Sequence, residues 1–114
     1  MDNALASISL QLATDIIHLC DGINNRAHIK NQILRSSGSI GANIYEAQYG
    51  YSRNDFVCKL QIALKECNET FYWLELLRNS ETITDEEAQP LVTKCSRLRF
   101  LLVKSINTAK LNQS

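Results

Sequence analysis

Apolar residues recur along the chain at steps of three and four, which is the spacing of one face of an α-helix. The first stripe lies between residues 3 and 21, and others follow over residues 27–48, 52–78 and 84–111. Ser52 and Thr84 precede the last two stripes, where a hydroxyl can cap the first turn of a helix. No short apolar run flanked by turn residues indicates a strand. The pattern therefore predicts an all-α fold.

The connections between the stripes are only a few residues long, so consecutive helices should run antiparallel. We therefore predict that residues 1–114 form one antiparallel up-down-up-down four-helix bundle. Its core should contain the striped residues, which are Leu5, Ile8, Leu12, Ile16, Leu19, Ile23, Ile29, Ile33, Ile40, Ile44, Ala47, Phe56, Leu60, Ala63, Leu64, Cys67, Phe71, Leu74, Leu91, Cys95, Leu98, Leu102, Ile106 and Ala109.

Some apolar residues fall outside these stripes. Ile62, Trp73 and Leu76 share a side of the third helix opposite its core stripe, and Phe100 and Leu111 do the same on the fourth. Scattered surface hydrophobes are one explanation, because soluble proteins commonly expose some apolar residues. Our hypothesis is that these residues form a subunit interface of a closed homo-oligomer, since a single subunit would leave them exposed.

The second helix contains a run of small residues, Ser36–Ala42, in which local propensity opposes a helix. A phosphate-binding loop is not indicated, because the Gly-Lys-Ser/Thr ending and a preceding strand are both missing. The small side chains instead predict a close approach of a neighbouring helix, under Phe56, Phe71 or Trp73. Leucine at Gly41 should then destabilise the fold or the assembly.

The 114-residue chain is 45% hydrophobic and carries 12 basic and 12 acidic side chains. This balance favours a globular domain and argues against a surface built entirely for nucleic acid. No apolar run is long enough for a membrane span, and residues 1–9 do not resemble a secretion signal, so we expect a cytoplasmic protein without a membrane partner. The four cysteines lack metal-ligand spacing and are expected to be buried thiols.

No pattern indicates catalysis, a cofactor, a metal or a small-molecule ligand. His18 and His28 are single histidines on polar helix sides, and no triad partner can be singled out for either. Glu66 and Glu69 lack the Glu-x-x-His motifs that a two-metal site in a helical bundle requires. Glu69 and Glu75 also lie at helical spacing from Lys65 and Arg78, so ordinary ion pairs account for them. We therefore expect a non-enzymatic protein.

The carboxyl-terminal helix is basic after residue 87, and a polyanion could meet it there. Its candidate nucleic-acid contacts are Lys94, Arg97, Arg99, Lys104 and Lys110. These five residues lie on two different sides of the helix, which argues against one continuous binding stripe. A favourable interaction of these cations with the helix dipole is the alternative explanation.

Two segments resemble one known family. Helix two contains Ser39, Ile40, Asn43, Ile44 and Glu46, and the next helix starts with Ser52 and Phe56 and continues with an Ile-Ala pair ending at Ala63, then Glu69. In this combination the chain resembles the four-helix-bundle proteins encoded in intervening sequences of bacterial 23S ribosomal RNA genes. The similarity covers about a third to a half of the chain.

The resemblance implies a cytoplasmic four-helix bundle, commonly a homopentamer, without established catalytic activity. Relatives include a basic accessory protein of diversity-generating retroelements that binds nucleic acid and a reverse transcriptase. Where the family usually has Gly and a basic pair before the serine, this chain has Ala47–Tyr51, which leaves Arg53 as the nearby cation and further candidate contact. We expect Asn43 and Glu46 to satisfy backbone amides at the start of the following helix.

Overall fold

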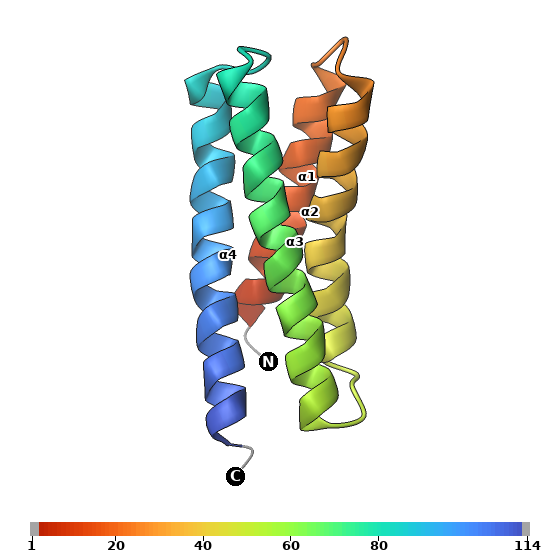
Figure 1. The fold of residues 1–114 in the computed structure, drawn as a ribbon, viewed down its shortest axis with the longest axis vertical. Coiled ribbons are helices and arrows are strands. Elements are labelled where there is room, and N and C mark those ends of the chain that lie inside the picture. The colour runs from red at the N-terminus through yellow and green to blue at the C-terminus, as the bar shows by residue number, and fades with distance from the viewer. Residues whose placement is uncertain (1–2, 113–114) are drawn as a thin grey trace.

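The computed structural model describes residues 3–112, and four helices make up almost all of them. They are α1 (Asn3–Asp21), α2 (Ala27–Ala47), α3 (Arg53–Asn79) and α4 (Asp85–Leu111) (Figure 1). Each bound lies within one residue of the bound expected from the sequence. The described residues contain four helices and no strand, so the predicted all-α class is confirmed.

Side-chain caps explain the sharp starts of α3 and α4. The Ser52 hydroxyl accepts a hydrogen bond of 3.1 Å from the Asp55 amide. Thr84 and Glu87 form a reciprocal pair in which each side chain accepts from the other residue's backbone amide. These bonds satisfy amides that the first helical turn leaves without partners, so both starts are encoded locally.

The helices pack side by side in the order α1, α2, α3, α4, and α4 also contacts α1. The loops after α1 and α3 lie at one end of the molecule and the loop after α2 lies at the other (Figure 1). At the shared end, the Arg26 side chain donates to the Thr82 hydroxyl over 3.2 Å. The result is a rod of 49 × 20 × 19 Å.

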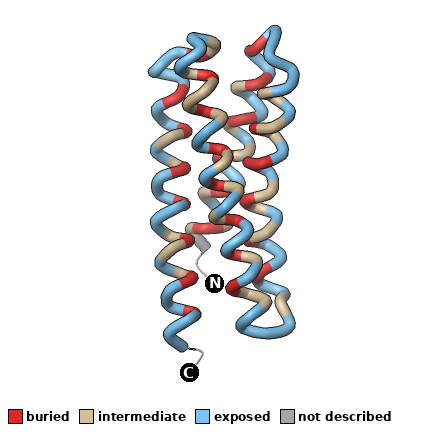
Figure 2. Tube along the Cα trace, viewed as in Figure 1, coloured by how far each residue is buried: buried red, intermediate tan, exposed pale blue. Residues whose placement is uncertain are grey.

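Buried residues follow the inward side of every helix (Figure 2). All six residues of the α4 stripe are buried, as predicted. Phe71 was expected in the core of α3 but is 41% exposed, because it stands at the edge of the stripe where α3 meets α4. Cys58 is also exposed, on the outer side of α3, so the prediction of a buried thiol is wrong at this position and holds for Cys20, Cys67 and Cys95.

The core includes hydroxyl groups that the apolar stripes did not reveal. Ser36 on α2 and Thr70 on α3 are fully buried and hydrogen bond to each other over 2.8 Å. Ser9 on α1 is 2% exposed and faces Gly41, where an added Cβ would lie 3.3 Å from the Ser9 Oγ. A neighbouring helix therefore approaches Gly41 closely, as predicted. That helix is α1, however, and not α3 with Phe56, Phe71 or Trp73 as we expected.

Candidate functional site

A hollow lies at the end of the bundle where α1 stops short. Helix α1 has 19 residues and α4 has 27, so α1 is shorter by about 12 Å. The last turns of α4 extend past the start of α1 (Figure 1). The missing helix surface leaves a hollow of about 300 Å³, lined by Arg53, Phe56, Leu101, Lys104, Ser105, Thr108, Ala109 and Asn112.

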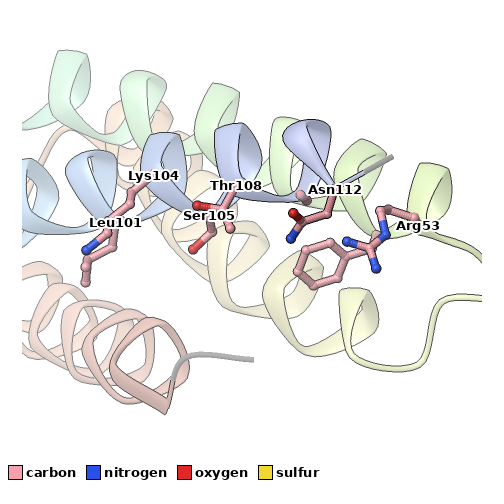
Figure 3. Close-up of a pocket in the computed structure, with 8 residues that line it drawn as sticks. Arg53, Leu101, Lys104, Ser105, Thr108 and Asn112 are labelled. Atoms are coloured by element: carbon pink, nitrogen blue, oxygen red, sulfur yellow. The ribbon is translucent and has the colours of Figure 1, made fainter. Parts of the chain in front are cut away.

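Two cations stand at opposite ends of this hollow. Arg53 begins α3 beside Asn112, and Lys104 lies about two turns earlier on α4 (Figure 3). The wall between them combines apolar side chains with the hydroxyls of Ser105 and Thr108. None of the described residues that line it is acidic. The arrangement suits an anionic group attached to an apolar body, because guanidinium and ammonium groups donate hydrogen bonds to phosphate or carboxylate oxygens.

The structure does not bring the six candidate nucleic-acid contacts to one surface. Lys94 is ion-paired with Asp15 of α1, and Arg99 lines a different hollow between α3 and α4. Arg97 and Lys110 are exposed on α4. Arg53 and Lys104 are thus the two candidates that share a concave site.

The expected interface residues differ in exposure. Phe100 and Leu111 are 65% and 78% exposed on α4, and Ile62 is 37% exposed on α3. Leu76 is half-buried. Trp73 is also only partly exposed, because its ring packs against the core and stands edge-on to His28 of α2, with ring centroids 6.4 Å apart.

An apolar surface on α1 was missed by the sequence reasoning. Leu10 and Ile17 are 70% and 51% exposed. They are seven residues apart, which places them on the same side of the helix, roughly 150° from Asp15, the residue that pairs with α4. Their spacing is visible in the sequence as a second stripe, but it falls outside the one that fills the core.

Most of the family-motif residues stabilise the α2–α3 pair. Ile40, Ile44 and Ala63 are buried. Asn43 donates to the carbonyl and hydroxyl of Ser39 over 2.8 and 3.1 Å. The prediction that Asn43 bonds to the start of α3 is therefore wrong, because its side-chain amide donates to Ser39, one turn earlier in α2.

Two carboxylates of the motif bridge the same helices. Glu69 is ion-paired with Arg35 of α2 and accepts a 3.1 Å hydrogen bond from the Trp73 indole. Arg35 also contacts Glu66 at 3.0 Å, and hydrogen bonds to these acids raise the pKa of its guanidinium. Glu46 lies 3.7 Å from Lys59, not at the amides of α3 that we expected it to cap.

Two features are absent from the described part of the chain. Among residues 3–112 no three histidine, cysteine, aspartate or glutamate side chains converge in a way that could hold a metal ion. No helix in that range is both long and apolar enough to cross a membrane.

Comparison with known proteins identifies the family. Residues 1–104 match the family described as 23S rRNA-intervening sequence protein. A crystal structure of a protein of unknown function, from the S23 ribosomal protein family of Bacteroides thetaiotaomicron, is 44% identical, with a TM-score of 0.84 over 90% of this chain and 97% of that one. Comparison with curated proteins gives no match. The resemblance seen in the sequence is thus confirmed, and the chain belongs to the 23S rRNA-intervening sequence protein family.

Proposed function

We propose that this protein is a non-enzymatic cytoplasmic scaffold, in which copies of the up-down-up-down bundle assemble into a closed ring. The observation that carries the proposal is the exposure of Phe100 and Leu111 on the outer side of α4. Large apolar side chains exposed on a rigid helix favour association, because burial removes their surface from water. A homopentamer is the size that the family resemblance favours.

A ring needs two different surfaces on each subunit, because each copy contacts the next head to tail. Phe100 and Leu111 on α4 supply one apolar surface, and Leu10 and Ile17 on α1 supply another. The α1 surface points away from the flank on which Asp15 pairs with α4. The two surfaces can therefore be used at once by two neighbours. In this arrangement Ile62 and Leu76 of α3 lie at the rim of the interface.

Replacing Phe100 with glutamate tests the assembly. We expect Phe100→Glu to dissociate the oligomer into monomers that retain their helical content, because a carboxylate would be desolvated at the interface. Native mass spectrometry and light scattering measure the particle mass. Asn31→Glu is the matched control, since it adds the same charge at an exposed position of α2, outside both proposed surfaces. A wild-type monomer at tens of micromolar would overturn the proposal.

Mixing two variants separates a ring from a two-fold dimer. Leu10→Glu should disrupt the α1 surface and Phe100→Glu the α4 surface. In a head-to-tail ring the two variants still share one intact junction, so their mixture should form a heterodimer that grows no further. In a two-fold α4 dimer, Phe100→Glu would instead lose association with every partner, and Leu10→Glu would dimerise alone.

A second candidate function is nucleic-acid binding, as an accessory protein that assists another macromolecule. The observation that favours it is the pairing of Arg53 and Lys104 in one hollow. A chain with no net charge must bind a polyanion through such a local site. Phosphate oxygens would contact both cations, and Phe56 offers an aromatic ring between them for a base to contact.

Salt-titrated binding to structured RNA and duplex DNA tests this second candidate. We expect Arg53→Gln and Lys104→Gln each to weaken binding and to reduce the slope of log affinity against log salt by about one. Lys65→Gln is the control, because Lys65 is an exposed cation of α3 outside the hollow. Absence of binding by the wild-type protein at low salt would exclude this function and leave the scaffold.

A further inference from the structure

Two thiols meet where α3 packs on α4. Cys67 and Cys95 lie on the core stripes of these helices and are 1% and 2% exposed. The Cys67 thiol donates to the Cys95 backbone carbonyl over 3.4 Å. Their positions are 28 residues apart in sequence, and the packing of the two helices brings them together.

A hollow of about 270 Å³ leads to this thiol pair. Both cysteines line it, together with Asn68, Phe71, Ser96 and Arg99. Phe71 is the aromatic residue expected in the core, and its displacement to the rim leaves the hollow beside the sulfur atoms open. The hollow therefore opens from solvent towards the two cysteines, although they are themselves almost fully buried.

The surroundings give the two thiols different acidities. The hydrogen bond from Cys95 lowers the pKa of Cys67 despite burial, and the positive charge of Arg99 lowers it further. The same hydrogen bond and burial raise the pKa of Cys95. Cys67 is thus the more readily ionised of the two thiols. A thiolate is the nucleophilic form of cysteine.

We propose that Cys67 and Cys95 form a dithiol site that reacts with hydroperoxides, with Cys67 as the attacking residue and Cys95 as the resolving residue. Arg99 stands at the hollow as the positioning cation for the incoming oxidant. This site is independent of the proposed scaffold function, because it requires only the contact between α3 and α4 within one chain.

The reaction balances with hydrogen peroxide as the oxidant. The Cys67 thiolate sulfur attacks one peroxide oxygen, the O–O bond breaks, and the departing hydroxide takes up the proton that Cys67 released on ionisation, which gives water. Cys67 is then a sulfenic acid. The Cys95 sulfur attacks the Cys67 sulfur, an S–S bond forms, and the sulfenic oxygen leaves as a second water with the Cys95 proton. Two thiols are oxidised, and one peroxide is reduced to two waters.

Peptide mapping after peroxide treatment tests the site. The experiment uses the Cys58→Ser protein, which lacks the exposed thiol. Limited hydrogen peroxide followed by alkylation should yield a Cys67–Cys95 cross-linked peptide that dithiothreitol releases. Cys20 should stay reduced, because burial raises its pKa and makes it a poor nucleophile. Cys67 and Cys95 both remaining reduced, or oxidation at Cys20 at an equal rate, would overturn the proposal.

Three variants assign the roles. In Cys95→Ala the resolving step is blocked, so dimedone should trap a sulfenic acid at Cys67, whereas Cys67→Ala should yield no adduct at Cys95. Arg99→Gln should slow peroxide consumption several-fold without changing helical content, because Arg99 is exposed and outside the core. Dimedone capture at Cys95 in Cys67→Ala, or an unchanged rate in Arg99→Gln, would contradict the assigned roles even if the other variant folds poorly.

Discussion

Leucine at Gly41 is expected to lower the free energy of unfolding by about 1–3 kcal/mol, the range typical of overpacked cores. A Cβ at this position would already lie 3.3 Å from the Ser9 Oγ and 3.7 Å from the Ser9 Cβ. Three further carbon atoms must then displace α1, because Ser9 is buried and its hydroxyl is held by the Ala6 carbonyl at 3.0 Å. Urea unfolding at fixed protein concentration, followed by circular dichroism, measures the change.

Gly38→Leu is the matched control, in the same helix and with the same change of residue. Gly38 is exposed, and an added Cβ there would meet nothing within 4 Å. Leucine should therefore stabilise α2 at this position by up to about 1 kcal/mol, because glycine is the poorer helix former. Equal effects of the two substitutions would refute the close α1–α2 approach as the reason for Gly41.

The helices could be located from the sequence because their signals are local. Ser52 and Thr84 are followed three residues later by Asp55 and Glu87, and the structure places all four in caps. The buried face of α4 could be predicted for the same reason. Apolar residues that recur about every 3.6 positions mark one face of a helix, whichever helices pack against it. Family membership also followed from short segments of α2 and α3.

Side chains at the edges of the stripes could not be placed in this way. A helical wheel gives the direction of Trp73 and Phe71 but not which neighbouring helix covers them. Trp73 is partly buried, with His28 of α2 edge-on to its ring, whereas Phe71 is left at the open seam between α3 and α4. Long side chains near a seam are therefore decided by tertiary packing, which single-helix periodicity does not contain.

The candidate sites are formed by residues from two helices. The sequence therefore indicated the individual residues but not which of them lie together. The end hollow exists because α1 is shorter than α4, and this brings Arg53 and Lys104 together while Lys94 pairs elsewhere. Cys67 and Cys95 were each recognisable as core positions. Their pairing follows from the register of α3 on α4, which no local signal specifies.

Valine at Thr70 is expected to lower the free energy of unfolding by about 1–3 kcal/mol, the cost of leaving a buried hydroxyl poorly satisfied. Thr70 Oγ1 lies 2.8 Å from the Ser36 Oγ and 2.9 Å from the Glu66 carbonyl. Without it, the nearest partner of the Ser36 hydroxyl is the Ile33 carbonyl at 3.4 Å. Valine keeps the β-branched shape of threonine, so the loss reports the hydrogen bond and not the packing.

A double-mutant cycle with Ser36→Ala isolates this interaction, because the two residues lie on different helices and are fully buried. In the Ser36→Ala background, the Thr70 hydroxyl still donates to the Glu66 carbonyl. Thr70→Val removes that bond there, but no buried serine hydroxyl is left without its partner. We therefore expect the double variant to be more stable than the sum of the single losses predicts, with a coupling of about 0.5–3 kcal/mol. Additive losses in urea unfolding would mean that the bond between α2 and α3 contributes nothing of its own. A positive coupling would show that α2 is fixed against α3 by a polar contact as well as by apolar packing, which makes the pairing of these two helices specific in register.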